Sequence, residues 1–333
     1  MPRVVGTDPG TSSLDLVLLD DGAVVDQRRF GPSDLRSDPD LIRRLFDAWG
    51  PIDLVAGPSG YGLPLIRGED VTEALVEAMA LTRPEERGTD SGVIGFRSWV
   101  RAFLASGVPT VFLPGGIHLP TIPPHRKANG IDLGTADKVA VVALAIERDG
   151  GESPTFAVIE VGSAFAAVLV VDWGRLVDAS AGTRGPVGLR SGGAWDGEAA
   201  YWRGPLAKSD LFRGGWADLG ELAPAAFTES LRKAVAGLRA VTPFRRAYRS
   251  GLGFERADVA EAGARALAGL VGPVALANLP GGWVKHAAQG AALIADGLAG
   301  GRHAGLVETL ALRRASGTIT DWLRPPLSPE VDP

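Results

Sequence analysis

The sequence predicts an α/β protein made of two similar three-layer domains around an interdomain cleft, and two observations lead to this prediction. The first is the opening stretch, in which an apolar strand runs into a glycine turn at residues 8–13 and two further strands follow. The second is that residues 156–178 repeat this arrangement. Internal repeats decide the architecture of a chain, so the repeat sets the expected fold.

The repeat keeps a constant offset of 152 positions, from Val4–Asp26 to Phe156–Asp178, without a gap. The corresponding turn residues are Asp8 and Glu160, Gly10 and Gly162, and Thr11 and Ser163. After each copy the apolar spacing predicts alternating helices and strands, so each half has the order βββαβαβα. We therefore expect domains over residues 1–150 and 151–322 and a disordered tail over residues 323–333, with a last helix over 304–315 that returns to the first half.

Composition excludes several classes of function. The 333 residues have a net charge of −5 and no basic stripe, so nucleic acid is not an expected partner. The chain has no cysteine, which excludes disulfides, thiolate metal sites and a cysteine nucleophile. No charged-then-apolar leader precedes the first strand and no uncharged run reaches about 18 residues, so we expect a cytoplasmic protein outside the membrane.

The first glycine turn has groups that suit a phosphate. Glycine lets the backbone approach a ligand, and N–H groups and hydroxyls bind phosphate oxygens, which assigns phosphate contacts to Gly10, Thr11 and Ser12. Asp8 could hold Mg²⁺ directly or through water. The alternative is an ordinary hairpin turn stabilised by its hydroxyls. The second copy favours the phosphate and adds Gly162 and Ser163 to these contacts.

Further candidate residues lie outside the first turn. Glu160 could hold a metal or orient a nucleophile, or it could be a surface residue at the end of a strand. Arg190 offers a planar, two-point grip on a carboxylate or phosphate, or a surface salt bridge. Asp196 could act as a base or metal ligand, or cap a helix. Thr135 and Lys138 are three residues apart and share one face of a predicted helix.

Taken in their order along the chain, the repeated glycine turns and the other candidate residues resemble those of the actin-like ATPase superfamily, which has a ribonuclease H-like fold. This superfamily includes sugar kinases, acetate and butyrate kinases and heat-shock chaperones. The chain resembles the acetate/butyrate kinase branch most, and within it an uncharacterised prokaryotic family labelled predicted butyrate kinases. The resemblance covers residues 3–321. It implies a phosphotransferase that uses ATP and Mg²⁺ and a small carboxylate or hydroxyl compound as acceptor.

Short motifs carry this resemblance. DPGTSS resembles the first phosphate turn of butyrate kinases, and IEVGSAFAAVLVVDWGRLVDA resembles their second phosphate stretch. RGPVGLRSGG resembles the segment with the arginine that binds the substrate carboxylate, which would be Arg190. YRSGLG resembles the adenosine loop and implies nucleotide contacts from Ser250, Gly251 and Gly253.

The chain departs from butyrate kinases in three places. Asp15 stands where they have a lysine shortly after the first turn. Their Gly-Arg-Gly-Gly substrate loop corresponds here to a loop without that arginine, and the resemblance assigns substrate contacts to Ser59, Gly60 and Tyr61. No aspartate matches the acid of acetate kinases, and His118, which lies near that place, completes the expected substrate residues.

Two functions therefore stay open. The first is a kinase in which Asp8, Glu160, Arg190 and Asp196 take part in catalysis. The second is a nucleotide-binding regulatory or assembly ATPase that hydrolyses slowly and signals by domain closure, which the missing lysine and acid favour. A degenerate member that binds no nucleotide is a third alternative, and the sequence leaves open whether the protein is a homodimer.

Overall fold

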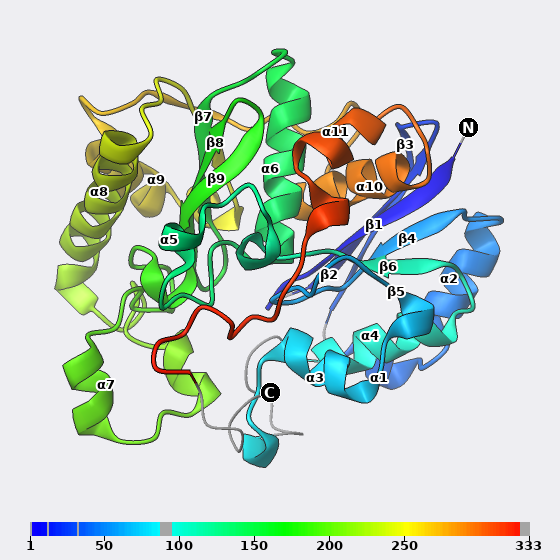
Figure 1. The fold of residues 1–333 in the computed structure, drawn as a ribbon, viewed down its shortest axis with the longest axis horizontal. Coiled ribbons are helices and arrows are strands. Elements are labelled where there is room, and N and C mark those ends of the chain that lie inside the picture. The colour runs from blue at the N-terminus through cyan, green and yellow to red at the C-terminus, as the bar shows by residue number, and fades with distance from the viewer. Residues whose placement is uncertain (1, 12, 32, 87–94, 327–333) are drawn as a thin grey trace. The chain divides into compact units, whose positions relative to one another are not determined.

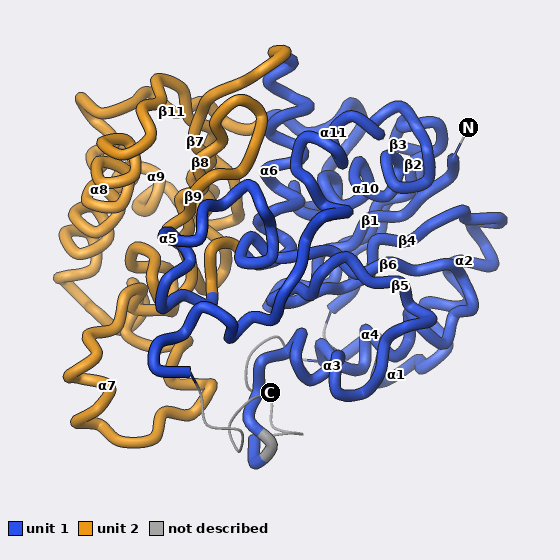
Figure 2. Tube along the Cα trace, in the orientation of Figure 1, with its two compact units in different colours: residues 1–131, 135–150, 277–333 blue, residues 132–134, 151–276 orange. Residues whose placement is uncertain are grey.

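The computed structural model describes residues 2–11, 13–31, 33–86 and 95–326, and it divides into two compact α/β units (Figures 1 and 2). Unit 1 comprises residues 1–131, 135–150 and 277–333, and unit 2 comprises residues 132–134 and 151–276. Residues 277–322, which the repeat assigned to the second domain, therefore lie in unit 1. The expected disordered tail over 323–333 falls mostly on residues outside the described part.

Unit 1 contains a six-stranded sheet in the order β3-β2-β1-β4-β6-β5. Its strands are β1 (Arg3–Pro9), β2 (Leu14–Asp20), β3 (Ala23–Phe30), β4 (Leu54–Gly57), β5 (Ile66–Arg67) and β6 (Thr110–Phe112). The first three strands are antiparallel neighbours, whereas β1, β4 and β6 run parallel. The short edge strand β5, which the sequence pattern did not predict, pairs antiparallel with β6.

Helices cover both faces of the unit 1 sheet. Neighbouring residues of a strand point to opposite faces, so two adjacent residues of β1 contact different helices. Val5 of β1 packs in a buried cluster with α2 (Leu41–Trp49) and α4 (Phe96–Ala105). Gly6 faces the other side, where a Cβ would overlap with the backbone of α10 (His286–Leu298) at Ala292. The remaining helices of the unit are α1 (Asp34–Ser37), α3 (Glu73–Ala80), α5 (Pro124–Lys127), α6 (Ala136–Asp149) and α11 (Ala304–Thr309).

Residues after 277 belong to unit 1 because helix α10 is buried there. Residues 287–297 of this helix are all buried, and the helix packs against β1 and α6. Helix α11 packs on α10 and α6, as expected for a last helix that returns to the first half. Figure 1 shows α10 and α11 beside β1 and α6.

Unit 2 contains a five-stranded sheet in the order β11-β10-β7-β8-β9. Its strands are β7 (Phe156–Val161), β8 (Ala166–Asp172), β9 (Arg175–Ser180), β10 (Ala247–Ser250) and β11 (Pro273–Ala275). Helices α8 (Ala223–Val241) and α9 (Ala257–Leu267) pack on one face of this sheet. Helix α7 (Gly197–Arg203) lies in a segment that the sequence pattern left irregular. In the part of the chain that the structure describes, no helix is long and apolar enough to cross a membrane.

The internal repeat is visible in the strand register. Asp8 pairs with Asp15 in the first hairpin, and Glu160 pairs with Ala167 in the second, at the same offset of 152 positions. Each hairpin continues into a third strand with one irregularity, between Leu18 and Leu19 in β2 and at the equivalent place in β8. The two units therefore repeat the same opening structure residue by residue, which confirms the duplicated α/β fold.

Candidate functional site

The first glycine turn lies at the carboxyl end of β1. This strand is parallel to β4, so the turn and the loop after β4 leave the sheet at the same edge, which is where α/β sheets bind ligands. The Gly10 N–H donates to the Ser13 carbonyl at 2.9 Å and closes the turn. Asp8 precedes the turn and is only 5% exposed. Ser12, a predicted phosphate contact, lies outside the described residues.

A lysine that the sequence analysis did not identify lies against this turn. The Lys285 Nζ donates to the Ser13 carbonyl at 3.0 Å and lies 3.5 Å from Asp8 Oδ2 and 3.6 Å from Asp15 Oδ1. It is so close to the turn that a Cβ on Gly10 would lie 2.5 Å from it. The turn therefore combines a buried carboxylate with a partly buried ammonium group.

The two carboxyl groups beside Lys285 differ in their electrostatics. Burial raises the pKa of the Asp8 carboxyl, and the charge of Lys285 offsets only part of this effect. Burial would also raise the pKa of Asp15, but hydrogen bonds from Arg29 and the charge of Lys285 lower it overall. Asp15 is therefore the carboxylate that ionises more readily, and Asp8 is the one that would gain most from a bound cation.

The start of helix α6 adds a second pair of charges. The Lys138 Nζ donates to Asp137 Oδ2 at 2.6 Å, and the Thr135 hydroxyl donates to Asp137 Oδ1. Burial opposes ionisation of Asp137, but the charge and the hydrogen bond of Lys138 lower its pKa overall. The charge of Asp137 in turn raises the pKa of Asp8, so the two carboxylates act on each other. The sequence pattern indicated Thr135 and Lys138 as neighbours on one helix face, but it did not indicate Asp137 as a site residue.

These residues fit a magnesium ion. Among the described residues no group of three or more His, Asp and Glu side chains could hold a metal ion by itself. Mg²⁺ does not need such a cage, since it keeps several waters and is usually bound by one or two carboxylates and by phosphates. Asp8 meets this requirement, because its buried carboxylate and the nearby charge of Asp137 both favour a divalent cation.

The loop after β4 lies beside α6, and its predicted substrate residues have structural roles. The Gly60 carbonyl accepts a hydrogen bond of 3.2 Å from the Ala136 N–H. The Ser59 hydroxyl donates to the Gly57 carbonyl and accepts the Leu113 N–H, both at 2.8 Å. The Tyr61 N–H donates to the Met79 carbonyl, and Gly60 has a φ of +54°. The backbone of this loop is thus fixed at the edge of the sheet.

His118 is buried against the same loop. Its Nε2 lies 3.3 Å from the Gly62 carbonyl and its Nδ1 lies 3.1 Å from the Gly317 carbonyl. Burial lowers the pKa of the His118 imidazole, which keeps the ring neutral. The side chain thus joins the loop after β4 to the C-terminal segment of unit 1, and its predicted contact with substrate stays a prediction.

The second glycine turn, in unit 2, repeats the geometry of the first. The Gly162 N–H donates to the Phe165 carbonyl at 2.9 Å. Glu160 is buried, so the alternative of a surface residue is wrong. Its Oε1 lies against the turn, 3.4 Å from the place of a Cβ on Gly162. Ser163 follows within the same turn.

The predicted adenosine loop follows β10 and lies against the end of β7. Ser250 is buried and is the parallel neighbour of Glu160. Gly251 has a φ of +96°, and a Cβ on it would overlap with the Val161 carbonyl. A Cβ on Gly253 would overlap with the Val161 side chain. Both glycines are therefore required by packing at the edge of the sheet.

The two remaining candidates, Arg190 and Asp196, differ in their contacts. The Arg190 N–H donates to the Ala164 carbonyl of the second turn, and its guanidinium lies 5.4 Å from the Phe212 ring centre. Within the described residues, this exposed arginine has no carboxylate partner, which contradicts the surface salt bridge. Asp196 is exposed and caps helix α7 by accepting the Glu198 N–H at 2.8 Å, so its predicted catalytic part stays a prediction.

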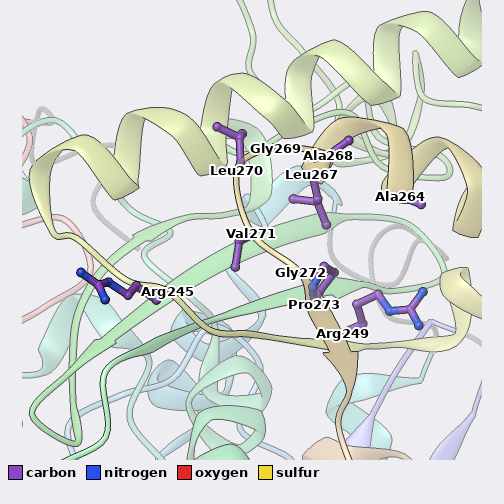
Figure 3. Close-up of a pocket in the computed structure, with 10 residues that line it drawn as sticks. All are labelled: Arg245, Arg249, Ala264, Leu267, Ala268, Gly269, Leu270, Val271, Gly272 and Pro273. Atoms are coloured by element: carbon purple, nitrogen blue, oxygen red, sulfur yellow. The ribbon is translucent and has the colours of Figure 1, made fainter.

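An open pocket of about 670 Å³ lies elsewhere in unit 2, between β10 and the end of α9. No predicted site residue lines it. Figure 3 shows that its two arginines, Arg245 and Arg249, point away from each other, so they do not form a joint site for an anion.

Comparisons with known proteins give a family and a fold. A family model described as "Protein of unknown function (DUF1464)" matches residues 6–325. No curated protein sequence matches the chain. The structure is similar to a propionate kinase from Francisella tularensis subsp. tularensis SCHU S4, with a TM-score of 0.60, 12% identity and coverage of 88% of this chain and 98% of that chain. It is also similar to the acetate kinase from Entamoeba histolytica, with a TM-score of 0.53, 12% identity and coverage of 79% and 85%. At this identity the likeness shows the fold alone, an α/β fold that this chain shares with the two kinases.

Proposed function

The chain belongs to the DUF1464 family of proteins of unknown function, and we propose that it is an ATP-dependent phosphotransferase. The observation that supports this most is the first glycine turn. There a buried carboxylate, Asp8, and a partly buried ammonium, Lys285, lie together at the carboxyl end of parallel strands. Opposite charges beside a glycine turn suit a metal-bound polyphosphate, which needs both a metal ligand and donors to its oxygens.

Each proposed role follows from the chemistry of the group. Asp8 holds Mg²⁺ directly or through water, and Gly10 and Thr11 contact phosphate. When bound, Mg²⁺ neutralises charge on the phosphates as the phosphoryl group moves. In unit 2, Gly162 and Ser163 contact phosphate as well. The adenosine is assigned to the loop of Ser250, Gly251 and Gly253, and the carboxylate of Glu160 orients a nucleophile or a metal.

We assign the acceptor to a small carboxylate or hydroxyl compound. Arg190 supports a carboxylate, because a guanidinium stacked on a ring keeps in-plane N–H donors for a two-point contact. The backbone of the Ser59–Tyr61 loop, fixed to the start of α6, supplies the other contacts. Butyrate is one acceptor of this class. The proposal includes a cytoplasmic location and leaves a homodimer open.

A second candidate is a nucleotide-binding regulatory or assembly ATPase. The side chains of Ser59 and His118 favour it, because both are held by backbone groups instead of facing a substrate. An enzyme that lacks a positioned acid and base near the acceptor would bind the nucleotide and hydrolyse it slowly.

Labelled ATP separates the two candidates. Purified protein is incubated with Mg²⁺, [γ-³²P]ATP and a panel of short carboxylates and hydroxyl metabolites, and transfer to each acceptor is measured. Acceptor-dependent turnover supports the phosphotransferase, whereas nucleotide binding without it supports the regulatory ATPase. Asp8→Ala should abolish turnover with the fold intact, and Asp21→Asn, in the half-buried turn between β2 and β3, should not. Normal turnover by Asp8→Ala would show that the metal assignment is wrong.

A further inference from the structure

We propose that Lys285 binds the phosphates of the nucleotide at the first glycine turn, as a cation brought there from the distant segment before helix α10. The inference rests on the proposed function, because it names a phosphate ligand for the same site. The sequence places this lysine outside every phosphate motif, and only the folded chain brings it to the turn.

The position of the Lys285 ammonium supports phosphate binding. Its Nζ lies 2.5 Å from the place that a Cβ at position 10 would take, so the ammonium group is in immediate contact with the turn. Glycine at position 10 therefore provides room for an ammonium group as well as for a ligand. A phosphate group bound to the backbone of this turn would lie within reach of the cation.

The hydrogen bonds of Lys285 also support phosphate binding, because they do not use all of its donors. An ammonium has three N–H donors, and the Ser13 carbonyl at 3.0 Å takes one of them. The carboxylates of Asp8 and Asp15 lie at 3.5 and 3.6 Å, which is longer than a normal hydrogen bond. The other two N–H donors of the group therefore stay available for the oxygens of a phosphate.

The backbone before helix α10 is held in place, so the cation is positioned before any ligand binds. Asp15 accepts the Lys285 N–H at 3.0 Å. Gln27 of β3 accepts the N–H groups of Trp283 and Val284 at 2.7 and 3.2 Å, and its amide donates to the Gly281 carbonyl at 2.9 Å. Two neighbouring strands of the hairpin thus fix the segment over residues 281–285, which reduces the ordering cost of binding.

A purely structural role for Lys285 would be to neutralise Asp15, and the geometry argues against it. Asp15 already accepts two hydrogen bonds from Arg29, at 3.0 and 2.6 Å to Oδ2, and one from the Ser13 hydroxyl at 2.7 Å. A second cation is not required there. Lys285 also lies 3.5 Å from Oδ2 of Asp8, the proposed metal ligand, and this supports a place for the lysine in the proposed nucleotide site.

Binding measurements with a matched control test the inference. Affinities for Mg·ATP and for adenosine are measured by calorimetry for the wild type, Lys285→Met, Lys285→Arg and Lys233→Met. Lys233→Met removes the same charge from an exposed ion pair on α8. A lost charge-assisted hydrogen bond predicts that Lys285→Met binds Mg·ATP about 10-fold to 100-fold more weakly. Adenosine, which has no phosphate, should bind within about twofold of wild type, and Lys285→Arg should recover part of the affinity.

A probe on the wild-type protein keeps the test independent of the variants. An acyl phosphate of ATP transfers its acyl group to an amine that lies near the terminal phosphates, with ATP as the leaving group. The expected labelled residue, found by mass spectrometry and suppressed by excess ATP, is Lys285. Labelling of Lys138 instead of Lys285 would overturn the inference.

The outcomes also separate this inference from the proposed function. Unchanged Mg·ATP affinity in Lys285→Met, or equal weakening for ATP and adenosine, overturns the role of Lys285 alone. Lys285-dependent binding without any acceptor-dependent turnover overturns the phosphotransferase and leaves the phosphate ligand in place. A wild type that binds no Mg·ATP overturns both.

Discussion

The Asp15 carboxylate accepts a hydrogen bond of 3.0 Å from the Lys285 N–H, which joins strand β2 to the start of α10 across 270 positions of sequence. Asp15 is fully buried, and Arg29 and Ser13 donate to the same carboxylate. Asp15 thus positions Lys285 at the first glycine turn, although the two residues are far apart in the sequence.

Asp15→Ala should strongly destabilise unit 1. The change leaves the Lys285 N–H and the Arg29 guanidinium without their acceptor. Because the Arg29 side chain is 40% exposed, the expected cost is that of an unsatisfied donor, about 1–3 kcal/mol of unfolding free energy. Urea unfolding followed by circular dichroism measures the loss. Asp40→Ala is the matched control, because its ion pair with Arg43 is exposed, and it should change the free energy by less than about 1 kcal/mol. Equal effects of the two changes would contradict the anchoring role of Asp15.

Much of the fold could be predicted because the repeat preserves local patterns. Strand alternation and the glycine turn recur at a fixed offset, and the register of the two hairpins keeps that offset. What the pattern did not predict was the division of the chain. Helix α10 follows the second copy in sequence, but Gly6 and Gly290 let it pack closely in unit 1, and such close contacts leave no periodic signal.

The candidate site could be predicted only where its functional groups are neighbours in the sequence. Asp8 and the turn were found because a carboxylate, a glycine and hydroxyls are adjacent in sequence. Lys285 was missed because its contacts are tertiary, and the one available signal was that Asp15 had replaced an expected cation. Asp196 shows a different limit of the sequence. An aspartate that caps a helix cannot be told from a catalytic aspartate until the structure shows that helix α7 begins directly after it.

His118 should make stability depend on pH. Burial lowers its pKa in the folded state, whereas the unfolded value is about 6.5. The unfolded chain therefore takes up the proton first, so the contribution of His118 is complete above about pH 6.5 and is lost as the pH falls through the folded pKa. Melting temperatures between pH 8 and pH 5 should fall less steeply for His118→Gln than for wild type. His125→Gln, on an exposed side chain, should follow the wild-type curve, and a parallel fall in all three proteins would contradict the assignment.

Gly290 should not tolerate a methyl group. Its Cβ would overlap with the Ala140 carbonyl, because α10 and α6 are in backbone contact there. Overpacking of this kind costs about 1–3 kcal/mol, and a rigid backbone neighbour places Gly290→Ala at the upper end or beyond. Gly237→Ala is the control, since this exposed glycine of α8 has nothing within 4 Å of a Cβ, and alanine should stabilise the helix by about 0.5–1 kcal/mol. Chemical denaturation should give effects of opposite sign.

Magnesium should determine how strongly ATP stabilises the protein. A ligand that binds only the folded state at 100 times its dissociation constant adds about 2.7 kcal/mol, so Mg·ATP should raise the wild-type melting temperature measurably. With excess EDTA the same ATP should stabilise less, because Asp8 then has no metal through which to contact the phosphates and its buried charge repels them. Asp8→Asn should therefore lose the difference between the two conditions, whereas Asp21→Asn should keep it. A wild type that responds equally to ATP with and without Mg²⁺ would remove Asp8 from the metal site and leave the turn and Lys285 as a metal-independent phosphate site.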